Sequence, residues 1–176
     1  MDLSGSVKDE YEMVVQFAQR VVYGLNMRYD RTRVGAVTFS TVVGDQFYMN
    51  TYTTKEAVIN ALNFHHEGGR TNMQAALEVT RTVHFKPSRG ERTGVRNVVA
   101  LISDGNSNVN AAKTIPEAKR LKGDAIDIFS IALGKSPNLP DLNEIANNPD
   151  SEYVVKLPTL ADVDAAANEF LQHLCK

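Results

Sequence analysis

The sequence has no long apolar run and no excess of charge of one sign. A membrane-spanning helix needs about 20 consecutive apolar residues, and no such run occurs in the 176-residue chain. Its 19 basic and 21 acidic residues are mixed along the sequence and give a formal net charge of −2. Without a basic stripe, nucleic acid and anionic membrane are disfavoured as main partners.

The sequence also lacks the short motifs of nucleotide-binding and hydrolytic sites. It contains no Gly-x-Gly-x-x-Gly, no Walker-type phosphate loop and no Gly-x-Ser-x-Gly. Nucleotide binding and hydrolysis therefore have no support from motifs. We expect a protein that is not an enzyme.

Cysteine is nearly absent, because Cys175 at the end of the chain is the one cysteine present. An odd cysteine in a secreted domain indicates a partner elsewhere, whereas a cytosolic protein would keep a free thiol. Both interpretations stay open at this point. No signal peptide opens the chain, so we expect an excised piece of a longer protein.

What the sequence does contain is a regular alternation of helical and strand patterns. With 43% apolar residues, the chain can form one domain with a substantial core. Alternation of this kind predicts a Rossmann-like, doubly wound α/β fold, mainly parallel, with one antiparallel edge strand and helices on both faces. The predicted helices span residues 7–26, 54–63, 72–83, 111–122, 139–146 and 160–174, and the predicted strands span 33–40, 42–49, 95–103, 125–133 and 153–156.

Three separate segments supply oxygen ligands of one chemical kind. Asp2, Ser4 and Ser6 place a carboxylate and two hydroxyls within one turn, Thr71 precedes an apolar helical pattern, and Asp104 follows an apolar strand pattern. In parallel sheets ligands bind at the carboxyl ends of strands, so these groups are expected to meet. Ser6 and Thr71 are also plausible helix N-caps, which would explain single residues but not the whole set.

Hydroxyls and carboxylates are hard oxygen donors. They favour Mg²⁺ or Mn²⁺, with Ca²⁺ as a further option, whereas zinc sites favour His and Cys. A cation held mainly by neutral hydroxyls retains the capacity to accept a further carboxylate. The pattern is therefore typical of binding an acidic group on a partner, and none of the five residues is an obvious catalytic base or nucleophile.

These residues carry a resemblance to a known family. Asp2-x-Ser4-x-Ser6, Thr71 in Gly-Gly-Arg-Thr-Asn and Asp104 in Ile-Ser-Asp-Gly-Asn resemble the complete metal-ion-dependent adhesion site of a von Willebrand factor type A domain. The resemblance extends over nearly the whole chain, and it is closest to the extracellular-matrix branch: matrilins, collagen-associated domains and shell or byssal matrix proteins. Segments 33–40, 118–122, 126–134 and 142–146 also fall where the family places strands and helices.

The resemblance implies that the chain is incomplete at its start. In that family the first Asp of the motif follows a buried central strand, but here only Met1 precedes Asp2. We therefore expect a single domain over residues 1–176, truncated at its N-terminus, whose first strand lies upstream or is replaced by another segment. Because extracellular members often bridge their two ends, the resemblance also suggests that Cys175 pairs with a cysteine outside this chain.

The function implied by the resemblance is that of a secreted adhesion module in an extracellular matrix or cell-surface protein. Its partner would be a matrix protein such as collagen, or another protein offering Asp or Glu, with the partner carboxylate completing the shell of a bound Mg²⁺ or Mn²⁺. Two other functions stay open: a matrix assembly module that binds through a metal-independent face, and a domain of an intracellular multiprotein machine.

Three further residues are candidates for contact with a ligand. Arg70 and Asn72 flank Thr71, and His66 lies in the loop that leads to it. All three are candidates because they lie close to Thr71 in the sequence. Surface histidines without Cys or further spaced His are more often solvated loop residues than metal ligands.

Overall fold

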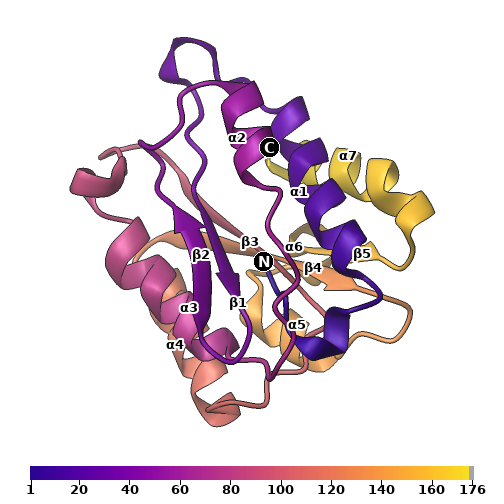
Figure 1. The fold of residues 1–176 in the computed structure, drawn as a ribbon. Coiled ribbons are helices and arrows are strands. Elements are labelled where there is room, and N and C mark those ends of the chain that lie inside the picture. Colours follow the sequence, from indigo (N-terminus) through magenta and orange to yellow (C-terminus); the bar gives the residue numbers. More distant parts are fainter. Residues whose placement is uncertain (175–176) are drawn as a thin grey trace.

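The computed structural model describes residues 1–174, and its strands and helices alternate as predicted (Figure 1). The strands are β1 (Ala36–Phe39), β2 (Val43–Phe47), β3 (Asn97–Ser103), β4 (Ile126–Leu133) and β5 (Val154–Leu157). The helices are α1 (Tyr11–Gly24), α2 (Lys55–Ala61), α3 (Met73–Val79), α4 (Thr114–Gly123), α5 (Leu139–Ile145), α6 (Asp150–Tyr153) and α7 (Val163–Leu174).

The sheet is covered by helices on both faces. Strands β3, β4 and β5 pair in parallel, and β1 and β2 form an antiparallel hairpin in which Ala36 lies opposite Phe47. Helices α1, α2 and α7 cover one face, and α3, α4 and α5 cover the other (Figure 1). The predicted fold class is confirmed, including the antiparallel edge hairpin.

Two apolar cores fill the space between sheet and helices. Strand β4 supplies both, since Phe129 and Ile131 pack toward α1 and α7 whereas Ile128 packs toward α4 and α5. This alternation follows from the two-residue period of a strand. On the first face the rings of Phe17, Phe129 and Phe170 meet edge to face, with centroids 5.1 and 6.1 Å apart.

Residues 1–3 lie in the sheet between β1 and β3. The amide of Asp2 donates to the Ile102 carbonyl at 3.0 Å, and the amide of Leu3 donates to the Phe39 carbonyl at 2.9 Å. Three residues thus connect the hairpin to the parallel strands. The first half of β3, Asn97 to Ala100, is half-buried, whereas its second half is buried. That the first strand of the family lies upstream of Met1, or is replaced by another segment, stays a prediction.

Several predicted element boundaries were wrong. The first helix begins at Tyr11, and Ser6 belongs to a preceding 3-10 turn (Gly5–Val7) instead of capping the helix. Helix α3 begins at Met73, and Asn72, not Thr71, is its N-cap, with the Asn72 side chain accepting from the Ala75 amide at 3.3 Å. In both cases the predicted cap is a hydroxyl that turns toward other hydroxyls.

Two further observations concern the described residues 1–174. No helix in this range is both long and apolar enough to cross a membrane. Cys175, for which the sequence predicts a disulfide partner outside the chain, lies outside the described residues.

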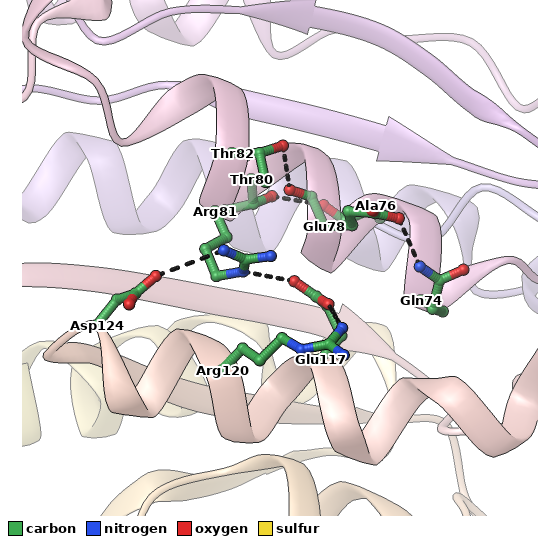
Figure 2. Close-up of polar contacts among 9 residues, drawn as sticks. All are labelled: Gln74, Ala76, Glu78, Thr80, Arg81, Thr82, Glu117, Arg120 and Asp124. Atoms are coloured by element: carbon green, nitrogen blue, oxygen red, sulfur yellow. Dashed lines mark hydrogen bonds and ion pairs between the residues drawn. The ribbon is translucent and has the colours of Figure 1, made fainter.

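A buried carboxylate connects α3 and its π-helical extension (Thr80–His84) to α4. The side chain of Glu117 is 1% exposed and accepts from Arg81 at 2.6 Å and from Arg120 at 2.7 Å (Figure 2). Asp124 adds a weaker contact to Arg81 at 3.7 Å. Burial alone would raise the pKa of Glu117, but the hydrogen bonds and charges of the two arginines outweigh it and hold the pKa below its ordinary value. Glu117 is therefore ionised in the folded protein at neutral pH.

Replacing Arg81 is expected to destabilise the protein. Arg81→Ala should lower the free energy of unfolding by about 3 kcal/mol, because a buried carboxylate loses one of its two guanidinium partners. Urea unfolding followed by circular dichroism measures the change. The control is Lys119→Ala on the same helix α4, since its ion pair with Glu144 is exposed and should contribute less than about 1 kcal/mol. Equal losses in the two variants would contradict the structural role of the buried pair.

Candidate metal centre

Three segments meet at the carboxyl ends of β1 and β3. Residues 1–3 pair with the ends of both strands, and the Ser4 to Ser6 turn follows directly. The loop before α3 is held against this turn, because the amide of Gly5 donates to the Gly69 carbonyl at 2.9 Å. Gly69 has φ +81°, and a Cβ there would meet the Thr41 hydroxyl, so glycine permits this close approach.

The three predicted hydroxyls form one cluster. Thr71 Oγ1 donates to Ser4 Oγ at 2.9 Å, and Ser4 Oγ lies 3.3 Å from Ser6 Oγ. Ser4 and Thr71 are buried, whereas Ser6 is exposed. The cluster therefore opens to solvent on one side and is closed by protein on the other. Residues 67 positions apart in the sequence supply neighbouring oxygens.

Asp2 lies beneath this cluster with its carboxylate fully buried. One oxygen accepts from the Ser4 amide at 3.0 Å, and the other accepts from the Ser103 hydroxyl at 2.6 Å. Burial raises the pKa of Asp2, and the charge of Asp104 raises it further, although the hydrogen bonds from Ser103 and Ser4 oppose both effects. The carboxylate has hydroxyl and amide donors and, within residues 1–174, no cationic side chain paired with it.

Asp104 begins the loop that follows β3. Its Oδ1 accepts from the Asn106 amide at 2.9 Å, and its own carbonyl accepts from the Asn138 amide at 2.8 Å. The side chain is half-buried. These contacts fix the carboxylate at the rim of the site, where its negative charge reaches Asp2.

The three predicted ligand-contact residues each have partners within the protein. The His66 Nε2 lies 2.9 Å from the Ser4 carbonyl oxygen, and the Arg70 guanidinium donates to the Asn108 carbonyl at 2.5 Å. The side-chain Nδ2 of Asn72 donates to the Thr41 carbonyl at 3.2 Å, and its Oδ1 caps α3. All three stand beside the hydroxyl cluster, and their contacts hold its loops in place. Their role in contacting a ligand stays a prediction.

Two residues that sequence reasoning missed also shape the site. Ser103 donates to Asp2, and the Asn108 side chain accepts from the Thr71 amide at 2.9 Å. The sequence could have indicated Ser103, because this residue directly precedes Asp104 and lies two residues from inward-facing Leu101. No sequence pattern indicates Asn108, since its role depends on how the loop after β3 folds back on Thr71.

The donor set fits a hard divalent cation by its chemistry. Within residues 1–174 no group of three or more His, Cys, Asp or Glu side chains is arranged to hold a metal, so any cation would depend on hydroxyls. Three clustered hydroxyls with two nearby carboxylates match the oxygen donors that Mg²⁺ and Ca²⁺ use. A buried carboxylate whose hydrogen bonds come from neutral donors is also an electrostatic environment that a bound cation would relieve.

The fold and this site together define a doubly wound α/β domain with a polar site at the carboxyl edge of its sheet. The chain belongs to the von Willebrand factor type A domain family, whose sequence profile matches residues 1–169. The resemblance to this family is thereby confirmed.

Similar proteins include matrix components. The chain is 25% identical over 169 residues to the collagen alpha-1(XII) chain of Notophthalmus viridescens, which covers 96% of this chain and 18% of that protein. It is 24% identical over 182 residues to matrilin-1 of Gallus gallus, with 99% of this chain and 36% of that protein covered. The chain thus spans well under half of the length of these relatives. Several relatives of this chain are extracellular matrix proteins.

A solved structure has the same fold. Proximal thread matrix protein 1 from the mussel byssus, in a form described as having a zinc-occupied MIDAS motif, superposes with a TM-score of 0.88 at 23% identity. The match covers 99% of this chain and 46% of that one. MIDAS abbreviates the metal-ion-dependent adhesion site, so a divalent cation at this motif has a precedent in the fold. The metal bound in that structure is zinc.

Removing the Ser103 hydroxyl is expected to expose the electrostatic cost of burying Asp2. Ser103→Ala should destabilise the metal-free protein by about 2 kcal/mol at pH 7, because a hydrogen bond to a buried carboxylate is lost. Since the pKa of Asp2 is raised, the carboxyl becomes protonated early as the pH falls, and the loss should shrink toward pH 4. Urea unfolding in EDTA at both pH values measures it.

The matched control is Ser130→Ala. Ser130 is equally buried, but its hydroxyl donates to the Leu142 carbonyl at 2.9 Å, which does not titrate. Its loss should therefore be the same at both pH values. A pH-independent loss in Ser103→Ala would contradict the role assigned to Ser103.

Proposed function

We propose that this domain is a divalent-cation-dependent adhesion module of an extracellular matrix or cell-surface protein. The observation that carries the proposal is the cluster of Ser4, Ser6 and Thr71 hydroxyls above the buried Asp2 carboxylate. Buried polar groups are normally arranged to satisfy one another or a ligand. This cluster opens at the surface, at the sheet edge where α/β folds bind ligands.

Five residues would hold the cation: Ser4, Ser6 and Thr71 through hydroxyl oxygens, with Asp2 and Asp104 as the nearby negative charges. Mg²⁺ and Mn²⁺ are the proposed ions, since both accept hard oxygen ligands and commonly keep open or water-filled positions. Ca²⁺ uses the same donors with more ligands. When bound, the cation supplies a positive centre that can accept one oxygen of a partner carboxylate.

The chain's own residues orient the site and keep it rigid. Ser103 holds one oxygen of Asp2, the Ser4 amide holds the other, and Asn108 fixes the Thr71 backbone. Such outer contacts orient ligands and affect affinity strongly. The hydroxyl oxygens carry no net charge, so the direct ligands leave the cation's charge largely unneutralised. An Asp or Glu of a partner protein is the group that would complete the shell.

The proposed partner is another extracellular matrix protein, such as a collagen, and the proposed location is secreted. Relatives that are collagen and matrilin chains support this placement. We propose binding without chemical turnover, because the five clustered residues include no nucleophile paired with a base.

Calorimetric titration of Mg²⁺, Mn²⁺ and Zn²⁺ into the protein tests the cation site. The wild-type protein should give saturable heat, and Asp104→Asn should weaken binding by about tenfold or more, because a charge at the site is removed. The control is Asp45→Asn, which removes an exposed carboxylate on β2 and should leave the affinity unchanged. No saturable heat in a folded wild-type protein would contradict the proposal.

A binding assay on collagen-coated surfaces then tests the role of the cation in adhesion. Binding that is lost in EDTA and restored by Mn²⁺ would support the proposed function. Binding that persists in EDTA and in Asp104→Asn would instead assign recognition to a metal-independent face of the domain.

A further inference from the structure

Two loops far apart in the sequence carry a concentrated positive charge. Residues 28–33 and 86–92 contain six of the 19 basic residues and two of the 21 acidic residues. Their net charge is +4, which leaves −6 for the rest of a chain whose total is −2. The mixed signs along the sequence therefore conceal a local excess. Together these two loops form the basic loop surface.

The two loops are joined by their own arginines. The Arg92 guanidinium donates to the carbonyl oxygens of Asp30 and Arg31, the latter at 3.1 Å. Arg33 reaches in the other direction and donates to the Gly90 carbonyl at 2.9 Å. Side chains with long flexible stems are thus used to connect backbone segments, which fixes the two loops relative to each other.

The basic loop surface lies at the end of the domain opposite the candidate metal centre. Its loops lead into β1 and β3 at their amino ends, whereas Asp2 and Asp104 lie at the carboxyl ends of these strands. In Figure 1 both loops lie in the upper half of the view, and the tip of the β1–β2 hairpin lies in the lower half. A ligand on this surface would not touch the hydroxyl cluster.

Some of these basic side chains form ion pairs within the protein, and others do not. Asp30 is paired with Arg33 at 2.6 Å and with Arg92 at 3.6 Å, so the acidic residue of the first loop is already neutralised. Arg28, Arg31 and Lys86 are exposed, and across the described residues 1–174 their side chains make no hydrogen bond or ion pair. These three present positive charge to solvent without a paired carboxylate, and Lys86 lines a pocket together with Glu91 and Asp124.

An exposed aromatic ring stands among these cations. Tyr29 is 93% exposed and has φ +54°, and the next residue, Asp30, has φ +58°. Two consecutive left-handed residues other than glycine are unfavourable by about 1 kcal/mol or more each. The surrounding contacts maintain this conformation, because the Arg28 amide donates to the Asn26 side chain at 3.1 Å and Arg92 holds the Asp30 carbonyl. The ring is thereby directed away from the core.

We propose that the basic loop surface binds a sulfated polysaccharide of the glycosaminoglycan class. Arg28, Arg31 and Lys86 would pair with sulfate and carboxylate groups, since guanidinium and ammonium groups form strong charge-assisted hydrogen bonds with oxyanions. Tyr29 would pack against the apolar face of a sugar ring, because a tyrosine ring offers flat apolar area with a polar end. No divalent cation takes part.

The composition of the surface favours this ligand over other polyanions. Tyr29 is the one aromatic residue in the two loops, whereas proteins that bind single-stranded nucleic acid stack successive bases on several aromatic rings. Anionic membranes attract helices with a wide apolar face beside their basic residues, and these loops have none. The −6 charge on the remainder of the chain also opposes close approach to an extended anionic surface.

Heparin affinity in EDTA tests the proposal, with chemically desulfated heparin as the comparison ligand. Wild-type protein should bind heparin and should bind the desulfated form at least about tenfold more weakly. The variant Arg28→Gln/Arg31→Gln/Lys86→Gln should lose about tenfold or more in heparin affinity and show a shallower dependence of log K on log salt, because fewer counterions are released. Tyr29→Ala should weaken binding severalfold without changing the salt dependence.

The matched control removes the same charge elsewhere. Lys8→Gln/Lys113→Gln/Lys135→Gln changes three exposed lysines outside the two loops and should reduce heparin affinity by less than about twofold. Equal losses in the two triple variants would show that only net charge matters and would overturn the proposal. Absence of heparin binding by the wild type, equal binding of desulfated heparin, or tighter binding of single-stranded RNA or phosphatidylserine vesicles would overturn it as well. Because EDTA is present throughout, failure of the metal centre would not affect these results.

Discussion

The short stretch of residues 1–3 between β1 and β3 is the contact on which the rest of the structure depends. Its amides donate to both neighbouring strands, and the Leu3 carbonyl accepts from the amides of Glu67 and Gly68 at 3.2 and 2.9 Å. The same three residues therefore make the hairpin and the parallel strands into one sheet, place the Asp2 carboxylate at the sheet edge, and anchor the loop that carries Thr71. Leu3 is fully buried, so apolar packing and site geometry are fixed by one segment. A substitution that loosened it would disturb fold and site together.

Within the described residues 1–174 the domain buries the carboxylates of Asp2 and Glu117, and it does so in opposite ways. Glu117 accepts from two arginines, which overcome the cost of burial and keep its pKa low. Asp2 receives hydrogen bonds only from neutral donors, so burial dominates and its pKa is raised. A carboxylate that served stability alone would be expected to be hydrogen-bonded to a cationic side chain, as Glu117 is, because a buried charge without such a partner is costly. A positive ion beside Asp2 would offset the negative charge of its carboxylate, and the adjoining hydroxyls are suitable oxygen donors for such an ion. Unfavourable electrostatics of this kind are common where a protein is built for binding and not for stability.

How much could be predicted from the sequence depended on the range of the interactions involved. The alternation of apolar strands and amphipathic helices predicted the fold class, because a strand such as β4 must be apolar on both faces to lie between two helical layers. The clustering of Ser4, Ser6 and Thr71 also followed, since strand ends meet at one edge. The caps were predicted wrongly: a hydroxyl before a helical pattern has the same local signature whether it caps the helix or turns toward another hydroxyl. Asn108 and the basic loop surface could not be predicted at all, because each depends on two loops that only the tertiary structure brings together.

The two surfaces at opposite ends of the sheet act over different distances, and this makes them physically separable. In the proposed function, coordination of a partner carboxylate by a cation is a contact interaction that requires the hydroxyl cluster to be aligned, so it would determine whether a partner stays bound. The positive charge on Arg28, Arg31 and Lys86 acts over about 8 Å at physiological ionic strength and mainly increases the rate of encounter with anionic polymers. A positive end and a negative remainder also orient the domain in the field of such a polymer, with the basic loop surface facing it. Since the strands run from that surface to the candidate metal centre, an oriented domain would present Ser6 and Asp104 away from the polymer, toward whatever protein lies beyond it.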